Sequence, residues 1–137
     1  DAGSGSLEQM ALAEFCKDNF NSHVKTLKIK LQKKSEAICN ALDKYFGSSA
    51  EYKKPDGGIF VWVDMHKKVD TSRLYELALK DGVAINPGNE WSINKSGRHK
   101  MRLCFGNPSI KEIDEGIKRL AIICRKEFGI PTKIANL

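Results

Sequence analysis

Apolar side chains recur at three- and four-residue steps between residues 22 and 46. This spacing predicts a long amphipathic helix. A shorter helix over residues 6–20 precedes it, and the polar run at residues 19–22 is expected to separate the two. With about 1.5 Å of rise per residue, the second helix would be roughly 40 Å long. A small compact domain needs less, so we expect this helix to bridge two bodies.

Residues 47–129 show short apolar runs that alternate with amphipathic segments. The run at residues 59–65 has β-branched and aromatic residues on both faces until Asp64, so we expect a central strand that is covered on both sides. The other expected elements are a helix from Asp70 or Thr71 to residue 80, strands at 83–85 and 100–105, and a capped helix from Ser109 to Gly129. The pattern predicts an α/β (α+β) small domain: a small mixed or antiparallel sheet with helices on one face, preceded by the long helix.

The strand at residues 100–105 carries the best candidate for a binding residue. Alternate side chains of a strand point to opposite faces, so Met101, Leu103 and Phe105 can enter the core while Arg102 faces the other way. A guanidinium group is planar and permanently charged, and its forked donors match a carboxylate. Because a strand would hold this group in place, Arg102 could bind an anion. A solvated strand arginine is the alternative that the residue alone leaves open.

Composition and charge narrow the choice of function. The 137 residues are 41% hydrophobic and 29% charged, as in ordinary soluble globular proteins. No apolar run is long enough for a membrane helix and no signal peptide is recognisable, so we expect a cytoplasmic protein without a membrane partner. Of the net charge of +6, residues 22–46 carry +4, because six lysines there face only two acidic residues. Without interleaved aromatic residues, a solvated helix face is favoured there over a nucleic-acid site.

The cysteines and histidines do not have the spacing of a metal site. The four cysteines form no C-x-x-C pair and the three histidines are scattered. We therefore expect no metal ligands, and four reduced thiols in a reducing compartment.

Five segments stand in an order and at a spacing that is typical of one family. They are SLEQMALA at 6–13, PDGGIFVW at 55–62, GVAINPG at 82–88, MRLCF at 101–105 and EIDEGIKRL at 112–120. In this order they resemble the C-terminal part of a class I/II (fold type I) pyridoxal-phosphate-dependent aminotransferase. The second and third segments are most similar to the branch of 2-aminoadipate, kynurenine and aromatic aminotransferases.

The resemblance implies a division of the chain. Residues 1–21 would be the end of the large cofactor-binding domain, 22–46 the interdomain helix, 47–129 the C-terminal small domain and 130–137 a tail. The fold would then be that of the C-terminal domain of a fold type I enzyme.

The resemblance also implies a function. The longer protein would transfer an amino group between an α-amino acid and a 2-oxo acid, as a homodimer. Arg102 would bind the α-carboxylate of the substrate, and Trp91 would lie on a loop near the substrate side chain. These two are the expected substrate-binding residues.

The family's cofactor chemistry depends on residues of the large domain. There a lysine forms the Schiff base with pyridoxal phosphate, an aspartate pairs with the pyridine nitrogen, and further groups hold the phosphate. None of the lysines here stands in the S-x-x-K or S-K setting followed by G-x-R-x-G that the family uses, and no glycine-rich phosphate loop opens a helix. We therefore assign no catalytic, cofactor-binding or metal residue, and expect the chain alone to be inactive.

Two other functions are compatible with the sequence. A transcription regulator with an aminotransferase-like ligand sensor would share every segment above, and the upstream sequence would distinguish it. A basic α/β module for RNA or DNA would depend on the lysines of residues 22–46 and would bind nucleic acid in a salt-dependent way.

Overall fold

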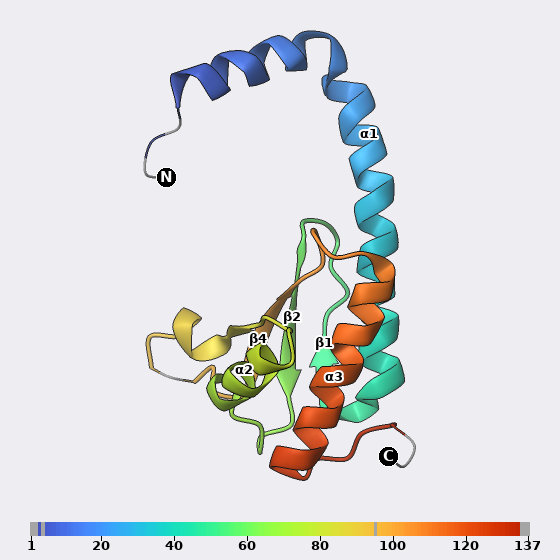
Figure 1. Cartoon of the computed structure of the whole chain (residues 1–137), viewed down its shortest axis with the longest axis vertical. Helices are drawn as coiled ribbons and strands as arrows, with labels where there is room; N and C mark the ends of the chain where they lie inside the picture. The colour runs from blue at the N-terminus through green and yellow to red at the C-terminus, as the bar shows by residue number, and fades with distance from the viewer. Residues whose placement is uncertain (1–2, 4, 95, 135–137) are drawn as a thin grey trace. The chain divides into compact units, whose positions relative to one another are not determined.

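The computed structural model describes residues 3, 5–94 and 96–134. The chain forms two compact units, one up to Lys30 and one from Leu31 onward. Helix α1 (Ser6–Tyr45) contributes to both units (Figure 1). In the first unit its large apolar side chains Leu7, Met10 and Leu12 are exposed.

Helix α1 is continuous through residues 19–22, so the predicted break there is wrong. The polar side chains of this stretch bond back to the carbonyl groups of the helix itself. The Ser22 hydroxyl donates to the Asn19 carbonyl at 3.0 Å, and the Thr26 hydroxyl donates to the Ser22 carbonyl at 3.0 Å. A serine used in this way is part of the helix and does not cap a new one.

The second unit contains a four-stranded antiparallel sheet in the order β1-β2-β4-β3. Its strands are β1 (Ala50–Tyr52), β2 (Phe60–Met65), β3 (Asn86–Pro87) and β4 (Lys100–Cys104). Its helices are α2 (Thr71–Lys80), α3 (Ile110–Phe128), the last part of α1, and the 3-10 turns η1 (Gly47–Ser49) and η2 (Gly88–Trp91). The antiparallel sheet with flanking helices confirms the predicted fold class.

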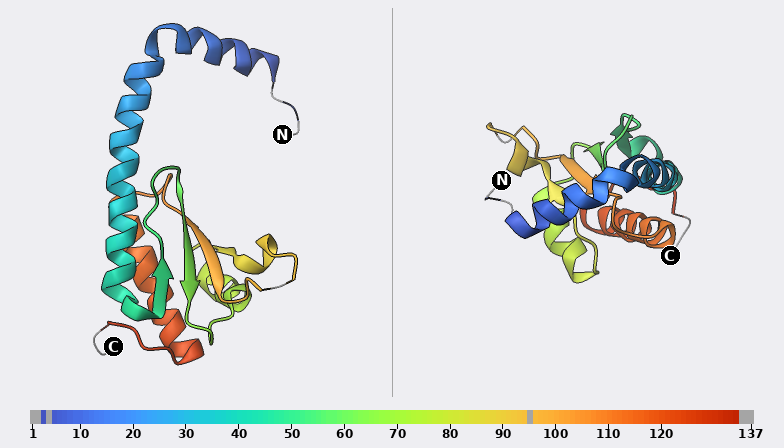
Figure 2. Two further views of the ribbon diagram at one scale, coloured as in Figure 1. Left: turned by 180° about the vertical axis from the view of Figure 1, so that it is seen from behind. Right: turned by 90° about the horizontal axis from the view of Figure 1, so that it is seen from above.

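One face of the sheet forms the core of the second unit. Val63 and Met101, on paired strands, are fully buried among Leu42 of α1, Leu74 of α2 and Leu120 of α3. Figure 2 shows these helices gathered against the sheet. As predicted, Met101, Leu103 and Phe105 point into this core.

Strand β2 is central, as predicted, but it is not covered on both sides. Val61, Val63 and Met65 are buried, whereas Phe60 and Trp62 are 38% and 41% exposed. Helices cover only the face on which the first three residues lie, so the aromatic side chains of the other face stay open.

The predicted strand at residues 83–85 is also wrong, because β3 is formed by Asn86 and Pro87. The Val83 amide donates to the Ala78 carbonyl at 2.8 Å, which makes it part of the end of helix α2. The ladder with β4 therefore starts only at Asn86, which pairs with Arg102.

The predicted helix ends of the second unit are confirmed. The Asp70 carboxylate accepts from the amides of Ser72 and Arg73 at the start of α2. Ser109 and Glu112 form the capping box of α3, which ends at Gly129 in the left-handed conformation (φ 62°).

Residues 3, 5–94 and 96–134 contain no helix long and apolar enough to cross a membrane. They also contain no cluster of three metal-ligating side chains. All four thiols are free; Cys39 and Cys124 are buried, whereas Cys104 is exposed on β4.

We expect Ser109→Ala to lower the free energy of unfolding by about 1 kcal/mol, because it removes the acceptor for the first-turn amide of Glu112. Urea denaturation with an unchanged m value measures the loss. Ser48→Ala is the control, since Ser48 is exposed and its hydroxyl has no hydrogen bond in the described part of the chain. Equal losses in the two variants would contradict the role of the cap.

We expect Cys124 to resist alkylation in the folded protein. Burial raises the pKa of its thiol from 9.0 to about 12. Because the thiolate is the reacting form, a pKa three units higher leaves about a thousandfold less of it at pH 8. Iodoacetamide labelling followed by mass spectrometry should find Cys104 modified long before Cys124. In urea the two should react alike; rapid labelling of Cys124 in the native protein would contradict its burial.

Candidate functional site

Arg102 occupies the middle of β4, on the face of the sheet that the helices leave open. Its direct partners across the ladders are Trp62 on β2 and Asn86 on β3. Met101 and Leu103 on either side of it are buried, which fixes the direction of the Arg102 side chain. The predicted alternation is therefore confirmed, and the guanidinium group belongs to a rigid element.

Two aromatic rings contact the Arg102 guanidinium. Its central carbon lies 4.1 Å from the centre of the Phe60 ring and 4.0 Å from the centre of the Trp91 ring. Phe60 comes from β2, diagonally across the ladder, and Trp91 from the end of η2. Figure 2 shows the loop that carries η2 beside β4. Arginine packs in this way on aromatic faces because the ring quadrupole attracts its weakly hydrated cation.

The Arg102 side chain has no hydrogen bond or ion pair with any residue that the structure describes. Its Nε is buried and has no partner among the described residues, and neither terminal nitrogen is paired with one of them. The other four arginines differ: Arg73, Arg98 and Arg119 pair with carboxylates, and Arg125 donates to the Ile134 carbonyl. Arg102 is thus the arginine of the described chain whose donors are unused.

The neighbouring charges on this face are already neutralised. The Lys100 ammonium lies 2.5 Å from one oxygen of Asp64, and His99 Nε2 lies 3.2 Å from the other. Because Asp64 is engaged with these two groups, it does not compensate Arg102. The guanidinium therefore presents an uncompensated positive charge between aromatic side chains, a setting that suits a small carboxylate.

Trp91 was predicted on a polar loop near the site, and the structure places it in η2 against Arg102. Phe60 and Trp62 belong to the same open face, and the sequence reasoning missed both. Their positions could have been found from the alternation of β2, because Phe60, Trp62 and Asp64 share one face of the strand. The pairing of that face with Arg102 depends on the β2–β4 register, which no local pattern gives.

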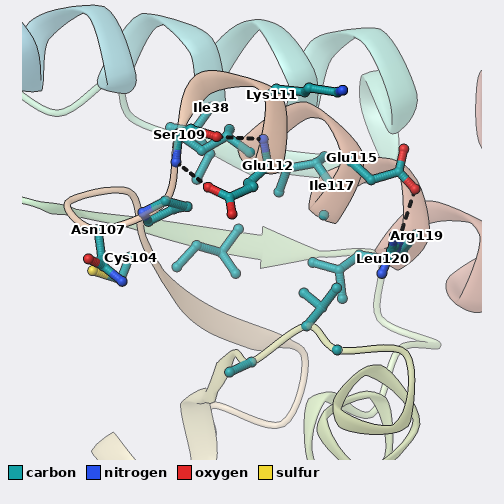
Figure 3. A pocket seen from close by; sticks show the side chains of 17 residues that line it. Ile38, Cys104, Asn107, Ser109, Lys111, Glu112, Glu115, Ile117, Arg119 and Leu120 are labelled. Atoms are coloured by element: carbon teal, nitrogen blue, oxygen red, sulfur yellow. Dashed lines mark hydrogen bonds and ion pairs between the residues drawn. The ribbon is translucent and has the colours of Figure 1, made fainter.

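A hollow of about 610 Å³ is lined by Trp62, Trp91 and Lys100 among others, but Arg102 itself does not line it. A second hollow, of about 800 Å³, lies between the end of β4 and the start of α3 (Figure 3). In that hollow Ser109 bonds to Glu112, and Arg119 donates to Glu115 at 2.9 Å. These polar groups hold helix α3, so we place the candidate site at Arg102.

A sequence model of the family described as aminotransferase class I and II matches residues 2–120. The chain belongs to this family. A 2-aminoadipate transaminase of Thermus thermophilus is 30% identical over 120 residues, which are 88% of this chain and 30% of that protein. This relative agrees with the predicted branch.

A solved structure and a regulator complete the comparison. The crystal structure of LysN, the α-aminoadipate aminotransferase of Thermus thermophilus, in complex with N-(5'-phosphopyridoxyl)-L-leucine, superposes with a TM-score of 0.81 at 29% identity. The match covers 88% of this chain and 31% of that one. An HTH-type transcriptional regulator of Bacillus subtilis is 32% identical over 127 residues, 92% of this chain and 26% of the regulator. The chain thus spans about a third or less of these relatives.

Pyridoxal phosphate is the cofactor that the family implies, and the described residues do not fit it. Both helix starts of the second unit are occupied by carboxylates, Asp70 at α2 and Glu112 at α3, which would repel a phosphate group. Hydrogen bonding to Ser109 lowers the pKa of Glu112 and so favours its charged form. Lys100, the lysine beside Arg102, is paired with Asp64. The described part of this chain therefore offers neither a phosphate cradle nor a free lysine at the site.

Proposed function

We propose that this chain is the C-terminal small domain, with its lead-in helix, of a pyridoxal-phosphate-dependent aminotransferase. In this proposal Arg102 binds the α-carboxylate of the substrate. The observation that carries it is the state of that guanidinium, which is held by β4 and two aromatic rings but has no polar partner among the described residues. A group with this geometry is ready for an anionic ligand.

Amino-group transfer uses one carboxylate site twice. The α-amino acid that donates the group and the 2-oxo acid that accepts it both carry a carboxylate next to the reacting carbon. A guanidinium fork that binds this carboxylate through two parallel N–H···O bonds would orient either substrate by the same contact. The Phe60 and Trp91 rings beside the guanidinium would shield the bound carboxylate from part of the surrounding water.

The remaining parts of the proposal concern the longer protein. Residues 1–21 would end its large domain and residues 22–46 would link the domains; we expect a cytoplasmic homodimer that binds neither nucleic acid nor membranes. The cofactor would be held by the large domain, since the described residues do not fit it.

A regulator is the second candidate, because an HTH-type transcriptional regulator matches 92% of this chain. In such a protein Arg102 would bind a carboxylate ligand as a sensor. The sequence upstream of Asp1 distinguishes the two: a helix-turn-helix domain ahead of the aminotransferase-like region would support the regulator.

We expect Arg102→Lys to lower kcat/KM of the full-length enzyme by about 30- to 150-fold, which corresponds to about 2–3 kcal/mol. Lysine keeps the positive charge but replaces a bidentate fork by a point charge, so most of the loss should be a higher KM. Arg102→Ala should lose more, because the enclosed carboxylate would have no partner. Steady-state transamination with denaturation midpoints measures both effects.

Arg98→Lys is the matched control for this substitution. Arg98 is an exposed arginine paired with Asp70 at 3.1 Å, and its guanidinium makes no cation–π contact with a described ring. It should keep kcat/KM within about twofold, as expected of an exposed change. Unchanged kinetics in Arg102→Lys, or a loss that only follows lowered stability, would contradict the carboxylate role.

We expect the 137-residue chain by itself to show no transamination and no stoichiometric complex with pyridoxal phosphate. The reason is the misfit described above, in which carboxylates occupy the helix starts and Lys100 is paired. Titration followed by visible absorption and gel filtration measures binding. A band at one-to-one stoichiometry that survives dilution would contradict this expectation.

A further inference from the structure

We propose that Phe60 and Trp91 are positioning residues that hold the Arg102 guanidinium in the orientation in which it meets the substrate carboxylate. The inference rests on the proposed function and adds two residues and a direction of approach to it. Both rings lie close to 4 Å from the central guanidinium carbon.

Arg102 needs such ring contacts because its side chain has no polar partner among the described residues. The other four arginines are oriented by a carboxylate or a carbonyl oxygen, whereas Arg102 has no such contact in the described chain. A long side chain without a polar contact keeps its rotamer freedom, and ordering it during substrate binding costs affinity. Ring contacts restrict the side chain without using its N–H donors. The guanidinium can therefore be oriented and still offer these donors to a ligand.

The buried Nε indicates which side of the guanidinium receives the ligand. Among the nitrogens of this side chain, Nε alone is buried without a partner in the described part of the chain. A carboxylate can therefore use the pair of terminal nitrogens and not the pair that includes Nε. With the rings in place, the pair of terminal nitrogens is the fork that remains for a ligand.

The two rings come from different kinds of structure. Phe60 is held by β2, which has β1 on one side and β4 on the other. Trp91 ends the four-residue turn η2 and is 54% exposed. Phe60 therefore contacts the guanidinium from a strand of the sheet, and Trp91 contacts it from a short turn.

Trp62 provides a matched control on the same strand face. It lies directly across the ladder from Arg102 and is about as exposed as Phe60, but its ring makes no cation–π contact among the described residues. A displacement of the Arg102 resonance caused only by removing an exposed aromatic residue would therefore occur in Trp62→Leu as well.

The first test is steady-state kinetics of the full-length enzyme. Phe60→Leu and Trp91→Leu should each raise KM for the amino acid about five- to tenfold with little change in kcat, because the contact orients a binding group in the ground state and the transition state alike. Phe60→Tyr and Trp91→Phe keep a ring and should restore KM to within about twofold.

The second test does not require catalysis. In the isotopically labelled chain, ring currents should displace the Nε–H resonance of Arg102, and its burial should slow exchange with solvent. Phe60→Leu and Trp91→Leu should move this resonance toward the position of an exposed arginine. Trp62→Leu should leave it in place.

The outcomes separate the inference from the function on which it rests. Normal kinetics in Arg102→Lys would overturn the carboxylate role itself, and the positioning role with it. Impaired Arg102→Lys together with ring-removed variants that keep KM within about twofold would overturn the positioning role alone. An Nε–H resonance of ordinary position and exchange in the unmodified chain would also overturn it.

Discussion

The antiparallel pairing of β2 with β4 is the constraint on which both the core and the candidate site depend. Its register sets Val63 opposite Met101 and Trp62 opposite Arg102. Since successive side chains alternate between faces, this single alignment sends the first pair into the core and leaves the second on the open face. A slip of one residue would bury the guanidinium and expose the apolar pair, so burial of the core also specifies the position of Arg102.

The sequence predicted best the elements that short-range chemistry determines. The capping box at Ser109, the cap at Asp70 and the alternation around Arg102 each depend on residues a few positions apart. The errors arose where one local pattern has two outcomes. A serine such as Ser22 can cap a helix or bond within it, and here it does the second. An apolar strand such as β2 can be buried on both faces or carry one open aromatic face.

The candidate site was predicted only in part for a related reason. Arg102 could be identified because its strand alternates clearly between charged and apolar residues. Phe60 could not be placed beside it, since the two residues meet through a pairing that joins positions about forty residues apart. The apolar character of β2 suggested a covered strand, whereas Phe60 and Trp62 lie on the face that the helices leave open.

The contrast between Arg102 and the other arginines explains why aromatic rings stand where a carboxylate could have stood. An acidic neighbour would compensate the charge and orient the side chain, but it would occupy the donors that a ligand needs. Phe60 and Trp91 interact with the cation through ring faces, which accept no conventional hydrogen bond from the terminal nitrogens. Asp64 could have supplied that carboxylate, but it pairs with Lys100 and His99. On this face the Arg102 guanidinium is therefore contacted by rings and unpaired among the described residues, while Asp64 pairs with Lys100 and His99.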